Sequence, residues 1–130
     1  SGRYGVMYKE WHLIGLELGV SVASVGLRGE ATGAAVCFNG DVAAIAKRDL
    51  KPGEMLDGEG GYTVSGGLRQ AMDSVRGGYL PLGLAHKVKL IRPVRDGEPV
   101  TYADVEMDTS SAAYRLRKDM EQTVLSGTGG

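Results

Sequence analysis

A short turn motif occurs twice in this chain of 130 residues. Shifting the sequence by 44 residues aligns Arg48–Leu56 with Arg92–Val100. Arginine, glycine and glutamate match identically, and three further positions match by residue type. Each copy contains a basic residue, a tight turn, an acidic residue and a short apolar step. Because duplicated supersecondary units inside one small domain pack against each other, the repeat predicts a compact β unit with internal pseudo-twofold symmetry.

Turn signals and short strands fill the region between residues 41 and 108. Lys51–Glu54 has proline then glycine at its centre, as a type II turn requires, and Arg95–Glu98 contains an Asp-Gly pair. The 21 glycines lack the three-residue period of collagen. The runs expected as strands are Val42–Ala46, Tyr62–Val64, Val88–Ile91 and Val100–Tyr102. This alternation predicts an all-β unit.

A helix is expected on each side of this unit. The run Leu13–Leu27 is apolar on all faces, which predicts a buried helix that needs a partner in a neighbouring domain or a dimer interface. Residues 109–125 carry one apolar stripe and a charged opposite face, which predicts an amphipathic surface helix. The expected division is therefore residues 1–40, 41–108 and 109–130.

The stretch Asp41–Leu56 resembles a SAF domain, the module shared by sialic acid synthases and type III antifreeze proteins. Ala46, Leu50, Gly53 and Leu56 carry its hallmark pattern, and Leu80–Ala85 and Val94–Val100 continue it. The resemblance implies a β-clip, a small pseudo-twofold β fold. The fold class expected is thus mainly β with flanking helices: a β-clip SAF domain preceded by a buried helix and followed by an amphipathic helix.

A wider resemblance includes Trp11–Glu17 and Gly58–Val64, which look like the C-terminal part of homoserine dehydrogenase-like NAD(P)-dependent oxidoreductases. That group includes deoxyxylulose phosphate reductoisomerase-like enzymes. The chain departs from it in lacking a proline within Tyr8–His12. The resemblance implies a longer parent protein with an upstream Rossmann domain that binds NAD(P). Residues 1–40 would then be the end of a central catalytic and dimerisation domain, followed by a connector.

Four residues are candidates for a site. His12 and Glu17 are five positions apart, whereas helical neighbours are three or four apart, so the spacing alone favours a packing or interface histidine. The resemblance implies that both lie at the catalytic surface of the central domain. Lys47 and Arg48 are candidate ligands for an anionic substrate in a neighbouring active site, again by resemblance. The alternative from the residues is that Arg48 and Arg92 pair with the glutamates of their turns.

Other kinds of site are disfavoured. Gly58–Gly61 matches half of a dinucleotide-binding motif, but residue 63 is threonine and no βαβ unit surrounds it. One cysteine and two separated histidines give no metal-ligand spacing, so Cys37 is expected to be an inert thiol and His86 a solvent-facing loop residue. A single cysteine fits a reducing, cytoplasmic setting. The net charge of −1 gives no footprint for nucleic acid or an anionic membrane.

Two functions remain open. In the first, the chain is the SAF-containing end of an NAD(P)-dependent oxidoreductase, covers the active site or supports dimerisation, and does not catalyse alone. Its partners would be a second copy or the upstream domains, with a small anionic or sugar-like substrate. In the alternative, it is a stand-alone SAF module that binds a carbohydrate or a partner protein. An antifreeze role is disfavoured because the two turns are charged.

Overall fold

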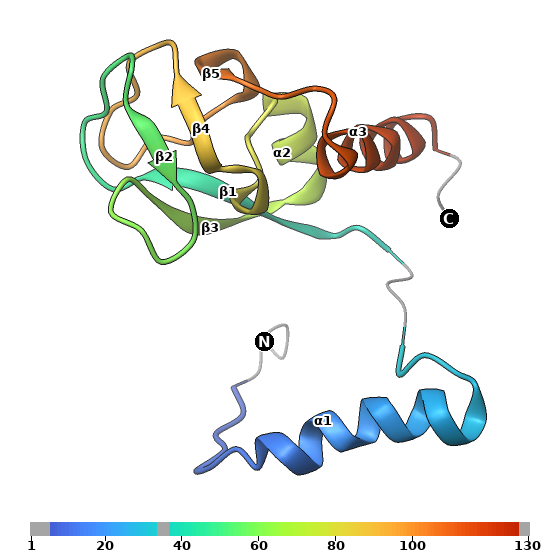
Figure 1. Ribbon diagram of the computed structural model, residues 1–130. Helices are drawn as coiled ribbons and strands as arrows, with labels where there is room; N and C mark the ends of the chain where they lie inside the picture. The colour runs from blue at the N-terminus through green and yellow to red at the C-terminus, as the bar shows by residue number, and fades with distance from the viewer. Residues whose placement is uncertain (1–5, 34–36, 128–130) are drawn as a thin grey trace. The chain divides into compact units, whose positions relative to one another are not determined.

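The computed structural model describes residues 6–33 and 37–127. The chain divides into two compact units, Ser1–Val36 and Cys37–Gly130 (Figure 1). The long C-terminal helix belongs to the same unit as all the strands.

The described part of the first unit, residues 6–33, contains one continuous helical segment. Helix α1 spans Ile14–Ala23 and continues as the π-helical turn η1, Ser24–Arg28. Gly29 ends it with a left-handed backbone, φ 66°, a conformation that glycine adopts without steric cost. The helix expected over residues 13–27 is therefore confirmed.

The same helix is not buried within this chain. None of its ten α-helical residues is buried, and apolar side chains such as Leu16 and Val20 stay mostly exposed. Ser24 is the one residue of the π-helical turn that is buried. No other described segment of the first unit covers this apolar surface, so burial by a neighbouring domain or a second copy stays a prediction. Any burial must come from contacts that the first unit does not make by itself.

The second unit is built on two small antiparallel sheets (Figure 1). Strands β1 (Gly40–Ala46) and β3 (Val64–Gln70) form a pair, with Ala43 opposite Gly67. Strand β4 (His86–Leu90) lies between β2 (Met55–Asp57) and β5 (Val105–Glu106). Isolated bridges connect β1 to the later part of the chain, at Ala43 with Pro81 and Ile45 with Pro99.

The duplicated turns make equivalent hydrogen bonds. The N–H of Gly53 donates to the carbonyl of Leu90 at 2.7 Å, and the N–H of Gly97 donates to that of Ala46 at 2.9 Å. Both donors and both acceptors are 44 positions apart. Leu50 and Val94, also equivalent, donate to each other's carbonyl at 2.8 and 3.1 Å. These equivalent hydrogen bonds agree with the internal symmetry predicted from the repeat.

The apolar core lies between these two halves. Leu50, Leu56, Val64, Leu80, Leu90 and Val100 are its largest fully buried apolar side chains. Two of these, Leu56 and Val100, are themselves equivalent positions in the repeat. Burial of such side chains contributes roughly 1.5–3 kcal/mol each, so both the repeated segments and the strands between them stabilise this unit.

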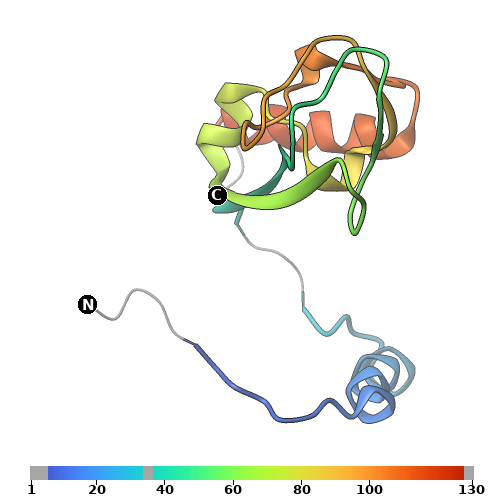
Figure 2. The same cartoon turned by 90° about the vertical axis from the view of Figure 1, so that its left-hand side faces the viewer.

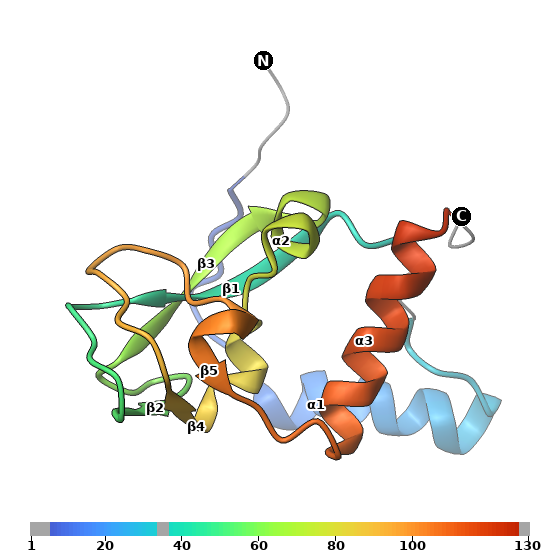
Figure 3. The same cartoon turned by 90° about the horizontal axis from the view of Figure 1, so that it is seen from above.

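Helices complete the second unit. Helix α2 (Ala71–Gly77) directly follows β3, and helix α3 (Ala112–Leu125) follows β5 and runs along one side of the unit (Figure 3). Ser111 caps α3 by accepting from the N–H of Tyr114. Two 3₁₀ turns, η2 (Leu82–Leu84) and η3 (Tyr102–Asp104), connect the strands. The helix expected over residues 109–125 is found as α3, starting at Ala112, but its apolar stripe does not face the unit. Leu116 of the stripe is 73% exposed, whereas Glu121 is the one buried residue, because the charged side of the helix pairs with the rest of the unit.

Several expectations for this region need correction. Of the run Tyr62–Val64 only Val64 lies in a strand, as the first residue of β3, and the helix after β3 was not expected. Residues 100–102 form no extended strand, because a single bridge from Thr101 to Tyr79 gives way to η3. Helix makes up 35% and strand 25% of the structure. The chain is thus a mixture of helices and small antiparallel sheets, and "mainly β" describes it only loosely.

Candidate functional site

The end of strand β1 lies beside a glycine-rich loop, residues 58–61. Two polar side chains hold this loop in place. Lys47 follows β1 directly, and its Nζ donates to the carbonyl of Gly61 at 2.5 Å. Its backbone N–H donates to the carbonyl of Thr63 at 3.0 Å. The strand therefore fixes Lys47 beside the loop, and two of its three ammonium donors remain for other partners.

Asp57 holds the loop from the opposite end. Its carboxylate accepts hydrogen bonds from the hydroxyl of Thr63, from the N–H of Tyr62 at 2.6 Å and from the N–H of Thr63 at 3.0 Å. These bonds lower the pKa of Asp57 to about 2, and the bond from the Thr63 hydroxyl has the largest effect. A Cβ at Gly61 would lie 2.1 Å from the carboxyl carbon of Asp57, so only glycine fits there.

This loop is suited to binding and not to proton transfer. A carboxylate with a pKa of about 2 stays ionised at neutral pH, so Asp57 has no role as a general acid or base there. The side chain of Tyr62, by contrast, is almost fully exposed at the end of the loop. The loop therefore presents an ammonium group and a phenol to solvent on a fixed backbone.

His86 adjoins the loop from β4. Its Nδ1 lies 3.1 Å from the carbonyl oxygen of Asp57, and a Cβ at Gly58 would lie 3.1 Å from its Cβ. The side chain is exposed, as expected, but His86 is the first residue of a strand and not a loop residue. The next residue, Lys87, has a left-handed backbone with φ 57°, where β4 bulges against β2. Such a conformation is uncommon for a residue with a side chain.

Arg48 forms an ion pair with Glu54 of its own turn. Its two terminal nitrogens lie 2.6 and 3.3 Å from the carboxylate oxygens of Glu54. Glu54 also accepts from the N–H of Lys51 at 2.7 Å. Hydrogen bonding with Arg48 lowers the pKa of Glu54, and the same pair raises that of Arg48. The predicted pairing within the first turn is therefore confirmed.

The second turn lacks this ion pair. Glu98 accepts from the N–H of Arg95 at 3.3 Å, as its counterpart does in the first turn. Among the ion pairs of the described residues, however, none joins Arg92 to Glu98. The prediction of two equivalent arginine–glutamate pairs is correct only for the first copy, because the backbone symmetry does not extend to these side chains.

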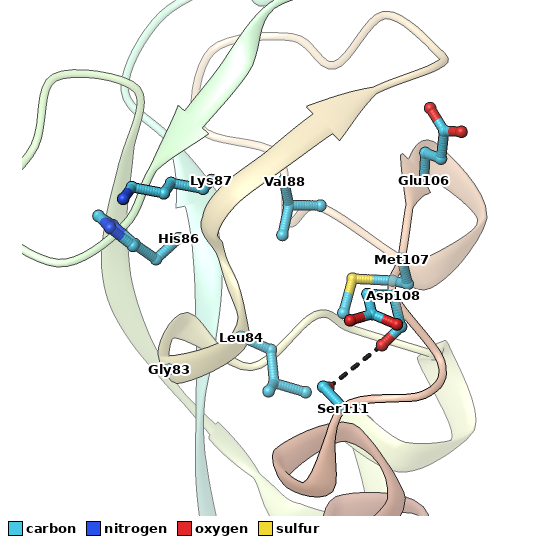
Figure 4. Close-up of a pocket in the computed structure, with 9 residues that line it drawn as sticks. All are labelled: Gly83, Leu84, His86, Lys87, Val88, Glu106, Met107, Asp108 and Ser111. Carbon is cyan, nitrogen blue, oxygen red and sulfur yellow. Dashed lines mark hydrogen bonds between the residues drawn. The ribbon is translucent and has the colours of Figure 1, made fainter.

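A pocket of about 370 Å³ opens on the other side of β4. Leu84, Val88 and Met107 form its apolar lining, and Asp108 and Ser111 add polar atoms (Figure 4). The side chains of His86 and Lys87 point away from these residues, so both line the pocket by their backbone (Figure 4). The pocket forms where the chain leaves β5 toward α3, between residues 83–88 and residues 106–111. The gap between these two segments arises from tertiary packing, so local sequence patterns do not predict it.

His12 and Glu17 lie together in the first unit. The His12 Nδ1 is 3.3 Å from a carboxylate oxygen of Glu17, and the ammonium of Lys9 binds the other oxygen. Lys9, and then His12, lower the pKa of Glu17. The two residues do not share a helix face, because α1 begins only at Ile14, and they meet because His12 folds back onto the first turn of the helix. All three side chains are substantially exposed.

The four predicted site residues therefore form two separate pairs. His12 and Glu17 contact each other in the first unit. Lys47 and Arg48 are consecutive in the second unit, but Lys47 binds the glycine-rich loop and Arg48 binds Glu54. Asp57 and Thr63 were missed by sequence reasoning. A signal for them existed in the spacing of an aspartate, a glycine four residues later and a threonine two residues after that.

A buried charge network was also missed. Arg117 of α3 binds the carboxylates of Asp41 and Glu121, and Glu121 also binds Lys118. Ser74 of α2 donates to Asp41 at 2.5 Å, and the ammonium of Lys118 lies 3.4 Å from the ring centre of Tyr102. Every member has a partner inside the unit. The network therefore attaches α3 to β1 and α2 and leaves no group free for chemistry.

No metal centre or membrane span is found in the part of the chain that the structure describes. Residues 6–33 and 37–127 contain no cluster of three or more histidine, cysteine, aspartate or glutamate side chains. Cys37 is exposed, and Asn39 donates to its sulfur at 3.2 Å. No helix within the same residues is long and apolar enough to cross a bilayer. The sequence matches no protein-family model and no curated protein.

Proposed function

We propose that this chain is the SAF-containing C-terminal part of a homoserine dehydrogenase-like NAD(P)-dependent oxidoreductase, with a β-clip in its second unit. Its role is to cover the active site or to support dimerisation of that enzyme. The observation that carries the proposal is the pair of equivalent hydrogen bonds from Gly53 to Leu90 and from Gly97 to Ala46. They support the proposal because they agree with the pseudo-twofold symmetry that the resemblance to SAF domains implies.

The polar groups of the second unit support an accessory role. Asp57 has its carboxylate occupied by the loop, and Arg48 has its guanidinium occupied by Glu54. Lys47 retains free donors, and Tyr62 is exposed beside it. In this proposal, the ammonium and the phenol contact a small anionic or sugar-like substrate, while the upstream domains of the parent supply NAD(P) and the reacting groups. His12 and Glu17 belong to that catalytic surface.

The parent protein provides the test. The full-length enzyme is compared with a version that stops before Ser1. We expect the shortened enzyme to bind NADPH, measured by fluorescence quenching, but to lose turnover or dimerisation. The 130-residue chain alone should give no saturable response to NADPH. A saturable response of this chain, or full activity of the shortened enzyme, contradicts the proposal.

The contact with substrate is tested separately in the full-length enzyme. Lys47→Gln should raise KM more than it lowers kcat, because binding is weakened without removal of a reacting group. Lys89, exposed on β4, offers a matched control as Lys89→Gln. Equal effects of the two substitutions would argue against a substrate contact at Lys47.

The pocket beside β4 supports a second candidate, a stand-alone SAF module that binds a carbohydrate or a partner protein. Its apolar lining and the Asp108 carboxylate together suit a small ligand with both apolar and polar surface. A glycan array and an NMR titration distinguish this function. Shifts confined to Leu84, Val88 and Met107 on addition of a glycan would favour it over the accessory role.

A further inference from the structure

Strand β3 has one edge that no other strand covers within residues 37–127 of the second unit. It pairs only with β1, and it lies at the margin of the second unit (Figure 2). The strand contains no proline, and its register with β1 is regular over all seven residues. Natural proteins usually protect such an edge with proline, a bulge or an inward-pointing charge, because open edges pair with other strands.

The hydrogen bonds of the neighbouring residues identify the free groups. Lys47 donates to Thr63, and Ala71 donates to Asn39, so odd-numbered residues of β3 face β1. Alternation along a strand then directs the N–H and C=O of Gly66 and Leu68 to the outer edge. Neither N–H has a partner among the described residues, and the carbonyl of Leu68 accepts only from its neighbour Arg69, at 3.0 Å. Val64 is fully buried, so the accessible edge runs from Ser65 to Gln70.

The surface beside this edge is apolar. The side chain of Leu68 is 74% exposed, and its partner in the register, Val42, is 45% exposed. A Cβ at Gly66 would lie 2.8 Å from Val42 and 3.0 Å from Leu82, so these side chains lie across the glycine. The edge and the apolar side chains together form one surface, which we call the β3 edge.

We propose that the β3 edge binds the β3 edge of a second copy of this chain, as an antiparallel pair centred on Gly67. In this register Gly66 of one copy faces Leu68 of the other, and each such pair exchanges two hydrogen bonds. The four groups that each copy leaves open at Gly66 and Leu68 are thus all used. Leu68 of one copy extends the apolar contact that Val42 and Leu82 make over Gly66 in the other.

Charge is compatible with a second copy as the occupant. The strand Val64–Gln70 contains one charged residue, Arg69, and it faces Ser65 of the other copy in this register. No like charges are therefore opposed, and a twofold axis satisfies both edges at once, as closed dimers do. Arg69 releases its bond to the Leu68 carbonyl when the strands pair. This contact is separate from α1 and does not depend on the oxidoreductase assignment.

Disulfide trapping tests this register directly. Ser65→Cys and Arg69→Cys are combined in a Cys37→Ser background, because Cys37 is exposed. Facing residues of a non-hydrogen-bonded pair have Cα atoms about 4.5 Å apart, within disulfide range. Within one strand the same two cysteines are about 13 Å apart, so an internal bridge cannot form. We expect about tenfold more disulfide-linked dimer from the double variant than from either single variant, since pairing raises the effective thiol concentration.

The single variants are matched controls, because each cysteine would face a residue without a thiol. A folded double variant that stays monomeric after oxidation overturns the proposal, as does equal cross-linking of the single variants. Leu68→Lys offers a second measurement, with Met55→Lys on β2 as its control at a similarly apolar, exposed position. Sedimentation should show weaker association for Leu68→Lys only, and equal association of both variants would likewise overturn the proposal.

Discussion

The guanidinium of Arg117 in α3 forms two hydrogen bonds, of 2.9 and 2.6 Å, with the carboxylate of Asp41 in β1. The Asp41 side chain is 6% exposed and that of Arg117 is 13% exposed. Burial acts to raise the pKa of Asp41, but Arg117 and Ser74 outweigh it, and the net effect lowers that pKa. Burial likewise acts to lower the pKa of Arg117, yet its bonds to Asp41 and Glu121 raise it. This pair therefore remains charged when the chain is folded.

Removal of Arg117 should destabilise the second unit. Arg117→Met leaves the Asp41 carboxylate buried without its cation, which costs about 3 kcal/mol of unfolding free energy in comparable sites. Urea denaturation followed by circular dichroism measures this loss. Arg115→Met, at an exposed position of the same helix, is the control and should change stability by less than about 0.5 kcal/mol. Similar midpoints for the two variants would contradict the role assigned to Arg117.

Replacing either of the two equivalent glycines of the repeat should cost a similar amount of unfolding free energy. Gly53 and Gly97 have φ values of 92° and 78°, and alanine at such angles costs roughly 1–2 kcal/mol. Gly53→Ala and Gly97→Ala should therefore each lower the unfolding free energy by about 1 kcal/mol. Gly83→Ala, at a glycine without positive φ and with no atom within 4 Å of a Cβ, should not destabilise the protein. A neutral Gly97→Ala would contradict the equivalence.

The acid stability of the chain should depend on Asp57. The pKa of Asp57 is about 2 in the folded chain, compared with an ordinary value of 3.8. Since the folded pKa is the lower one, its contribution is fully present above about pH 4 and is lost as pH falls toward 2. Asp57→Asn should thus be less stable than wild type at pH 7 and close to it at pH 2. Thermal unfolding at both pH values checks this, and a constant difference would exclude the proposed linkage.

The uncovered helix α1 should drive self-association at high concentration. Leu16 and Val20 are largely exposed on it, and contiguous apolar surface of this kind favours association. Leu16→Glu and Val20→Glu should each shift sedimentation toward the monomer. Leu116→Glu, at an exposed leucine of α3, is the matched control and should leave the distribution unchanged. A wild-type chain that is purely monomeric at high concentration would remove the basis for this prediction.

Local sequence patterns predicted the parts of the fold that local chemistry determines. The turn around Gly53 and the helix over residues 13–27 follow from glycine placement and apolar periodicity, and both were found. The extension of β3 through Gly66 and Gly67 was missed because glycine has low strand propensity. Those glycines are present because the Val42 and Ile45 side chains lie across them, which is a tertiary reason.

The candidate site was predicted less completely than the fold. Lys47 and Arg48 were identified, but their partners, the Gly61 carbonyl and Glu54, decide what each can do. Only the partner of Arg48 was predictable, because it lies within the same turn. The contact between His12 and Glu17 was missed because a helical spacing rule was applied to His12, which lies outside the helix.

The exchange of hydrogen bonds between Leu50 and Val94 has a consequence for how the second unit can be assembled. Each turn finds its backbone acceptor on the other half of the repeat, so neither half forms a closed structure by itself. Cleavage between the halves, in the segment after α2, should yield two peptides that fold only when mixed. The second unit is in this sense an association of two half-length segments within one chain, and we expect it to fold only when both segments are present.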